Sequence, residues 1–94
     1  MYRVRSTKKF VKSIRRLERG GLKREVIEEI ENVVSQLVAG EKLATNYRDH
    51  QLQGELSAYR ECHIRGDLLL IYQIRDRELI LVLIDVGSHS QIFG

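Results

Sequence analysis

The chain has 94 residues, of which 43% are hydrophobic, and a formal net charge of +3. This length and composition predict one small domain, residues 1–94, with enough apolar side chains for a single core. No apolar run approaches the ~18 residues that span a bilayer, and the first residues lack the apolar region of a secretory signal. We therefore expect a soluble, cytoplasmic protein without a membrane partner.

The charge is distributed unevenly along the chain. Residues 1–24 carry ten of the sixteen Lys and Arg residues and one acidic residue, which gives a local charge of +9. The remaining residues carry six basic and twelve acidic groups, a balance of −6. Concentrated positive charge is a common footprint for binding a polyanion such as nucleic acid, and a merely solvated basic helix is the alternative.

The first part of the chain predicts a strand followed by a basic helix. Tyr2–Arg5 forms a short alternating run, and Ser6 or Thr7 can cap the helix that follows. Apolar residues then recur at helical spacing: Phe10, Val11, Ile14 and Leu17. Basic side chains occupy the rest of the circumference: Lys8, Lys9, Lys12, Arg15, Arg16 and Arg19.

A second helix is predicted from Leu22 to Val38, between the breakers Gly20-Gly21 and Gly40. The short connection predicts an antiparallel helix hairpin packed through its apolar stripes. The exposed side of the second helix is acidic. It would therefore make a poor DNA-recognition helix, which disfavours a helix-turn-helix protein.

The second half predicts a loop and then strands. Glu41–Gly54 is polar and irregular, and strands are predicted at Leu56–Ile64, Leu68–Arg75 and Leu79–Ile84. The last of these is continuously apolar, which is typical of a central strand. The element order predicts an α+β fold with an N-terminal strand, the helix hairpin and a mainly antiparallel sheet that the helices cover on one face.

The alternation of side chains along the strand predicts that the candidate catalytic residues point to the uncovered face of the sheet. In the first long strand Tyr59, Glu61 and His63 point one way while Cys62 and Ile64 point the other way. We interpret the single cysteine as core packing and not as a nucleophile. Two more histidines come from loop-like segments outside the strands: His50 and His89.

Motifs in the C-terminal half resemble a known family. They are Tyr47–Gly54, Tyr59–His63 with Asp67 and Leu70–Tyr72, and Gly87–Ser90 with Phe93–Gly94. Together they resemble the YafQ-like branch of the RelE/ParE superfamily, the toxins of bacterial toxin–antitoxin pairs. The resemblance implies a RelE-like, microbial RNase-type fold and a ribosome-dependent mRNA endonuclease that cuts in the A site without a cofactor. It also implies a small antitoxin partner, with operator DNA bound only through that antitoxin.

The same resemblance implies the site residues. Five positions match the family's active site: His50, His63, Asp67, His89 and Phe93. Glu61 stands where the family has aspartate, and its longer side chain shifts the carboxylate. Gln51 replaces an expected proline, a change that affects the stiffness of the loop more than the chemistry.

Histidine suits metal-independent RNA cleavage, in which the 2′-hydroxyl loses a proton, attacks phosphorus and expels a 5′-oxygen that gains a proton. We expect His89 to be the acid and His50 or His63 the base, with Glu61 and Asp67 orienting an imidazole. Phe93 is expected to stack on a base. Contacts to RNA backbone are expected from Arg60 and, through the basic helix, from Lys8, Lys9, Lys12, Arg15 and Arg16.

Three other interpretations remain open. The histidines with Asp67 and Glu61 are suitable zinc ligands, although none has the compact His-x3-His spacing of a helix site. A gyrase-inhibiting toxin on the same fold has no use for histidine proton transfer. A plain DNA-binding module would use the basic helix alone. Asp67 has the further alternative of only shaping its turn.

Overall fold

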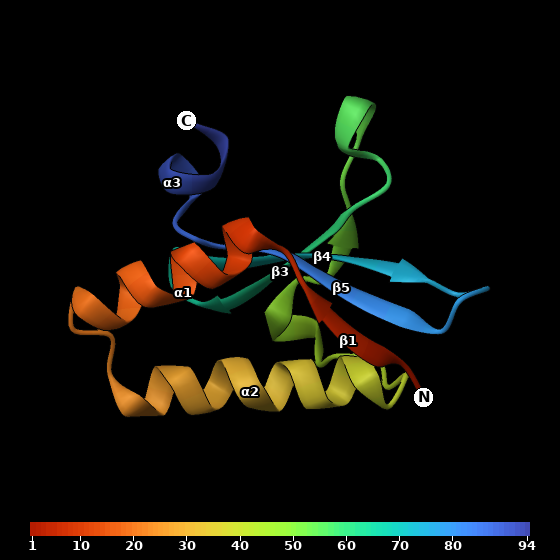
Figure 1. Ribbon diagram of the computed structural model, residues 1–94, viewed down its shortest axis with the longest axis horizontal. Helices are drawn as coiled ribbons and strands as arrows, with labels where there is room; N and C mark the ends of the chain where they lie inside the picture. Colours follow the sequence, from red (N-terminus) through yellow and green to blue (C-terminus); the bar gives the residue numbers. More distant parts are fainter.

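One five-stranded sheet organises the protein, whose computed structural model describes residues 1–94 (Figure 1). The elements in chain order are β1 (Arg3–Ser6), α1 (Lys8–Arg19), α2 (Arg24–Val38), β2 (His50–Gln51), β3 (Arg60–Arg65), β4 (Leu68–Arg75), β5 (Ile80–Gly87) and α3 (His89–Phe93). The strand order is β1-β5-β4-β3-β2, and only the β1–β5 pair is parallel. The predicted α+β fold with a mainly antiparallel sheet is confirmed.

A side-chain cap and two glycines explain where α1 begins and ends. Thr7 caps α1, because its side chain accepts a hydrogen bond from the backbone N–H of Phe10. The chain leaves the helix through Gly20 and Gly21, and Gly21 has a φ of 90°, which glycine adopts without strain. None of the helices has the length and apolar character needed to cross a bilayer.

One face of the sheet, which we call the covered face, forms the core beneath α2. Alternate strand residues point to it, and Cys62, Leu70 and Val86 lie side by side across β3, β4 and β5, completely buried. Val33 of α2 packs into the same cluster. The interpretation of Cys62 as core packing agrees with this position, since burial raises the pKa of its thiol to about 12.

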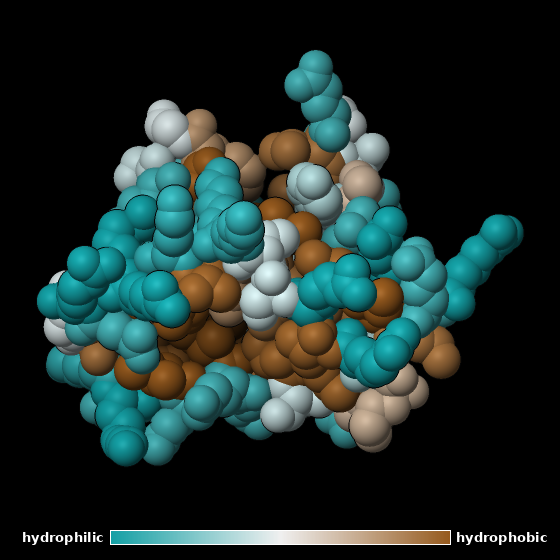
Figure 2. Space-filling view, viewed as in Figure 1, coloured by the Kyte–Doolittle hydropathy of each residue, from teal (hydrophilic) through white to brown (hydrophobic).

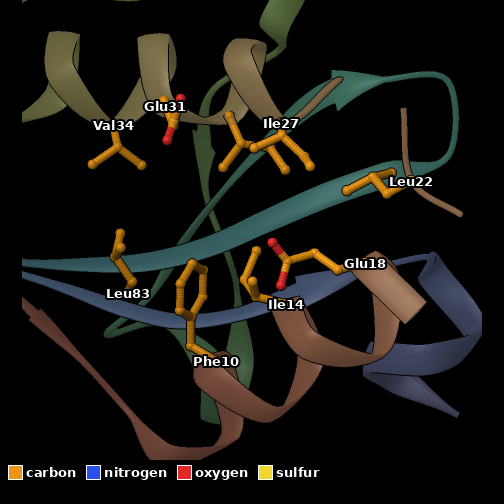
Figure 3. A pocket seen from close by; sticks show the side chains of 9 residues that line it. Phe10, Ile14, Glu18, Leu22, Ile27, Glu31, Val34 and Leu83 are labelled. Atoms are coloured by element: carbon orange, nitrogen blue, oxygen red, sulfur yellow. The ribbon is translucent and has the colours of Figure 1, made fainter. Parts of the chain in front are cut away.

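The helix hairpin is more open than its apolar stripes predict. Phe10 of α1 and Ile30 of α2 pack in the same core with Leu83 of β5, so each helix rests on the sheet. An apolar groove of about 340 Å³ remains between the helices, visible as hydrophobic surface in Figure 2. Figure 3 shows its lining at close range, with Glu18 and Glu31 among the apolar side chains.

Two predicted strand boundaries are wrong. β3 begins at Arg60 and not at Leu56, because Gly54–Leu56 forms a 3-10 turn that carries the chain away from the sheet. The Leu52 N–H still bonds to the Tyr59 carbonyl at 3.0 Å, which closes the intervening segment as a loop. The expected Leu79–Ile84 strand is instead β5, which continues to Gly87.

The connections also differ from expectation in detail. The predicted two-residue turn after β4 is a four-residue turn, in which Leu79 has a φ of 55°. The chain after β5 was expected to be irregular but forms the short helix α3. Ser88 and Gln91 build a capping box at its start. The Ser-x-x-Gln spacing is the sequence signal that identifies this helix.

Candidate active site

The face of the sheet opposite α2, which we call the open face, carries two rows of facing residues. Glu61, Ile71 and Asp85 pair across β3, β4 and β5 in one row. His63, Leu69 and Gly87 form the next row. α3 and the segment between β2 and β3 both stand on this side of the sheet (Figure 1). The open face is therefore a sheet floor between two raised borders.

Glu61 lies between two histidines on this floor. β2 pairs with β3 so that His50 is directly opposite Glu61, and His63 follows two residues later on the same face. A single carboxylate oxygen, Glu61 Oε2, lies 3.3 Å from His50 Nε2 and 3.4 Å from His63 Nε2. The Glu61 side chain is 6% exposed, whereas those of His50 and His63 are 49% and 26% exposed. A buried carboxylate thus faces two imidazoles that solvent can reach.

The backbone fixes which nitrogen of His50 faces the carboxylate. His50 Nδ1 lies 2.6 Å from the carbonyl oxygen of Arg48, and a carbonyl can only accept, so Nδ1 donates. Nε2 is then the nitrogen that faces the carboxylate of Glu61. Since the Nε2 atoms of His50 and His63 both face Glu61, a proton taken up on either one is held next to the same negative charge.

A polar network holds the β2 segment in place from the covered face. The Tyr72 hydroxyl donates to Asp49, the neighbour of His50, and Arg60 contacts the same Asp49 carboxylate at 3.3 Å. Burial first, and then the bond to Asp49, raises the pKa of Tyr72. Arg60 was expected to contact RNA, but the structure directs its side chain to Asp49 and Tyr72, away from Glu61 and His63.

His89 and Phe93 enter the open face from α3. Their rings lie 5.0 Å apart, centroid to centroid, at an angle of 49°. The backbone N–H of His89 donates to Asp67 Oδ1 at 3.4 Å, so Asp67 joins the β3–β4 turn to the start of α3. Asp67 was expected to orient an imidazole, and the contact that the structure records is instead with the backbone of a histidine.

The basic residues of α1 differ in their surroundings. Lys9 reaches the open face, where its Nζ lies 3.7 Å from Asp85 Oδ2. Lys8 and Lys12 are exposed. Lys12 also belongs to a shallow hollow that four basic side chains line without any apolar residue: Lys12, Arg15, Arg16 and Arg19.

Asp85 is a further buried carboxylate of the open face that was not predicted from the sequence. This carboxylate is only 3% exposed, and it accepts a hydrogen bond from the Ser13 hydroxyl at 2.6 Å. The signal available in the sequence is a single acidic residue directly after a continuously apolar run. Its partner on α1 lies 72 residues away, so the sequence does not reveal the contact.

The zinc alternative requires a cluster of ligands. No group of three or more His, Cys, Asp or Glu side chains is arranged to hold a metal ion. The three histidines with Glu61 and Asp67 therefore do not converge on one point in this structure.

The chain is similar to proteins of one bacterial family. The profile of the family described as "Bacterial toxin of type II toxin-antitoxin system, YafQ" matches residues 2–94. The mRNA interferase toxin YafQ of Escherichia coli K12 is 40% identical over 48 residues, 51% of this chain and 50% of that protein. The match with the curated relatives thus spans about half the length of each.

Solved structures share the whole fold. A crystal structure of a metal-bound toxin from Helicobacter pylori is 40% identical, covers 99% of this chain and 100% of that chain, and has a TM-score of 0.89. The crystal structure of the E. coli DinJ–YafQ complex is 24% identical, covers 100% of each chain and has a TM-score of 0.87. At that identity the second comparison shows the fold alone.

Proposed function

The chain belongs to the YafQ family of toxins from bacterial type II toxin–antitoxin systems, and from this premise we propose that it is an endoribonuclease that cleaves mRNA in the ribosomal A site. The E. coli relatives are named mRNA interferase toxins, which supports an activity on mRNA. The ribosome, present in the cytoplasm, would deliver the substrate. The chain's own histidines would perform the proton transfers.

The observation that carries the proposal is the carboxylate shared by two imidazoles. Glu61 Oε2 contacts His50 Nε2 at 3.3 Å and His63 Nε2 at 3.4 Å, and both rings are open to solvent. A general base must hold the proton that it removes, and an adjacent buried carboxylate stabilises the resulting imidazolium. A binding protein without catalytic activity has no need of this arrangement.

We assign the base to His50, because it is the more exposed ring and because Arg48 fixes its tautomer. Its Nε2 takes the proton of the 2′-hydroxyl, whose oxygen then attacks the adjacent phosphorus. The bond to the 5′-oxygen breaks, and His89 supplies the proton for that leaving group. The products are a 2′,3′-cyclic phosphate and a 5′-hydroxyl end, and His63 holds the phosphate between the two.

We expect the sheet to hold the two proposed proton-transfer groups on opposite sides of the substrate. His50 lies on β2, three strands from β5, and His89 follows Gly87 of β5 by two residues. Three strand spacings amount to roughly 14 Å between backbones, so a phosphodiester would bind between a base on one side and an acid on the other. In-line displacement needs its base and acid on opposite sides of phosphorus.

The basic side chains of α1 supply the contact with the ribosome in this proposal. Lys12, Arg15, Arg16 and Arg19 share one exposed surface without apolar residues. Such a cluster binds RNA phosphates by releasing counterions, so binding should weaken steeply with salt. Phe93 is 40% exposed, and in this proposal it stacks on an unpaired base.

A cognate antitoxin completes the proposal. The E. coli YafQ toxin has been solved as a complex with DinJ, described as its antitoxin complex. We expect this chain to be neutralised by an antitoxin of its own, which would also supply any binding to operator DNA. Free toxin should then show no sequence-specific affinity for duplex DNA.

Primer-extension mapping on a translated message tests the proposal. Wild-type protein should produce in-frame cuts, and His50→Ala and His89→Ala should remove them while circular dichroism shows both variants folded. Gln53→Ala, an exposed residue of the same segment as His50, is the matched control and should cut like wild type. Toxin stripped with a chelator before addition to ribosomes should remain active. Growth arrest by the wild type without any cuts would contradict the proposal.

A further inference from the structure

A second feature of the open face lies next to the proposed site of cleavage. A slot of about 120 Å³ opens beside the histidine cluster. One wall comes from the segment between β2 and β3, the other from α3, and the floor from β4 and β5; the lining residues are Leu52, Leu56, Tyr59, Ile71, Ile84, Ile92 and Phe93, with Lys9 and Asp85. A dry apolar cavity of about 150 Å³ holds a benzene molecule. The slot is slightly smaller and open to solvent, so it suits the six-membered ring of a nucleobase whose remaining atoms stay outside.

One end of the slot is polar, with Asp85 as the hydrogen-bond acceptor and Lys9 as the donor. Asp85 Oδ1 is occupied, since it accepts from the Ser13 hydroxyl at 2.6 Å and from the Val86 N–H at 2.8 Å. Asp85 Oδ2 has only Lys9 Nζ near it, at 3.7 Å, which is too long for a hydrogen bond. No buried side-chain oxygen or nitrogen lacks a partner, so Oδ2 must reach solvent. Its outlet is the slot that Asp85 lines.

We propose that this slot binds the nucleobase next to the cleaved bond and that Asp85 and Lys9 select bases that present an amino group beside a ring nitrogen, as adenine and cytosine do. The amino group donates to Asp85 Oδ2, and the ring nitrogen accepts from the ammonium group of Lys9. In the same pose uracil presents a carbonyl oxygen to Asp85, where cytosine has its amino group, and a ring N–H to Lys9, where cytosine has an acceptor nitrogen, so both contacts are lost. The biological role of the slot rests on the proposed function, whereas the binding itself does not.

The sheet connects the slot to the site of cleavage. Asp85 and Glu61 are the two ends of one row, with Ile71 between them, so the two carboxylates stand roughly 10 Å apart on the same face. A phosphodiester at the histidines and a base in the slot are thus held by neighbouring positions of one strand of RNA. Phe93 borders the slot and also contacts His89, which joins the two sites.

Binding of nucleotides to protein with labelled isoleucine methyl groups tests the slot without any cleavage. AMP and CMP should shift the NMR signals of Ile71, Ile84 and Ile92, which line the slot. UMP should bind about tenfold more weakly, and ribose 5-phosphate should not shift these signals. The isoleucines of the groove between α1 and α2 are an internal control and should stay unshifted: Ile14, Ile27 and Ile30.

Substitution of the polar pair makes the test sharper. Asp85→Asn keeps the Oδ1 acceptor for Ser13 but turns the other atom into a donor, which faces the amino group of AMP or CMP, so the preference for these two nucleotides over UMP should be lost. Lys9→Met should weaken AMP and CMP binding several-fold, and Lys42→Met, an exposed lysine outside the slot, should not. Equal binding of all three nucleotides by wild type, or an unchanged preference in Asp85→Asn, overturns the proposal.

Cleavage maps separate this proposal from the nuclease assignment. In wild type, cuts should lie next to adenine or cytosine, and in Asp85→Asn the cuts that remain should lose this preference. Histidine-dependent cuts with the same base profile in both proteins would refute the slot alone. Selective methyl shifts in a protein that never cuts would support the slot and refute the nuclease.

Discussion

The two faces of the sheet use the same three strands for opposite purposes. On the covered face Cys62, Leu70 and Val86 meet across β3, β4 and β5 and are sealed beneath α2. On the open face the neighbouring row begins and ends with carboxylates, Glu61 and Asp85, both at least 95% buried. The covered face is thus held together by apolar packing, whereas the open face contains buried carboxylates. Buried carboxylates weaken a fold unless partners compensate them, and they lie on the side where we propose the active site.

The separation of the two faces is not complete. Tyr72 belongs to the covered face, yet its hydroxyl reaches Asp49, the residue before His50. Stability and the position of a proposed catalytic group are therefore coupled at this one point. Substitutions on each face, and at this link, test how far the separation holds.

Glu61→Gln should give the largest effect on activity. Without the negative charge between the imidazoles, cleavage should fall about 10²- to 10³-fold, while the free energy of unfolding changes by less than ~1 kcal/mol, because removing a buried charge offsets the lost contacts. Primer extension and urea denaturation measure the two quantities. Glu55→Gln, an exposed carboxylate, is the control. Full activity in Glu61→Gln would show that the open face does not depend on this charge.

Leu70→Ala should give the largest effect on stability. Leu70 is completely buried on the covered face, and its truncation leaves a cavity, so the free energy of unfolding should drop by about 2–5 kcal/mol. Val11→Ala, on the exposed side of α1, should stay within ~0.5 kcal/mol. Urea denaturation followed by circular dichroism measures the free energy of unfolding of both variants. A loss below 1 kcal/mol would mean that the covered face is not the main core.

Tyr72→Phe tests the link between the faces. It removes a hydroxyl that bonds Asp49 and Arg60, so the unfolding free energy should fall by about 1–3 kcal/mol. Because Asp49 adjoins His50, cleavage at low temperature, where the variant is folded, should fall as well. Tyr59→Phe changes an aromatic residue that has no recorded hydroxyl partner and should leave stability nearly unchanged. Lost stability with intact cleavage would show that the two faces are independent.

Over the range from pH 8 to pH 10, alkaline pH should produce the smallest effect, through Cys62. Burial raises the pKa of its thiol from 9.0 to about 12. Above pH 9 the unfolded thiol loses its proton while the folded one keeps it, so stability falls as pH rises from 9 to 12, by at most ~1.4 kcal/mol per pH unit. Urea midpoints at pH 8, 9 and 10 should decline less steeply in Cys62→Ala. If the urea midpoint declines equally steeply in wild type and in Cys62→Ala, the thiol has no role in this pH dependence.

Much of the open face was predictable because strand alternation is a local property. The spacing of Glu61, His63 and Cys62 alone predicts which side each one faces, and the structure agrees. Helical periodicity likewise locates α1 and α2 within a few residues. The start of β3 was not predictable in this way, since Tyr59 continues the alternation of Glu61 and His63 but lies before the strand and lines the slot.

The sequence by itself determined the alternation of apolar and polar residues, the two helices and the family resemblance, because each depends on neighbours in the chain. Only the tertiary structure decided that one oxygen of Glu61 faces both His50 and His63, and that Asp85 meets Ser13 across 72 residues. These contacts depend on strand register and on where α1 crosses β5. Register and crossing are set by packing of the whole core, and no local pattern encodes them.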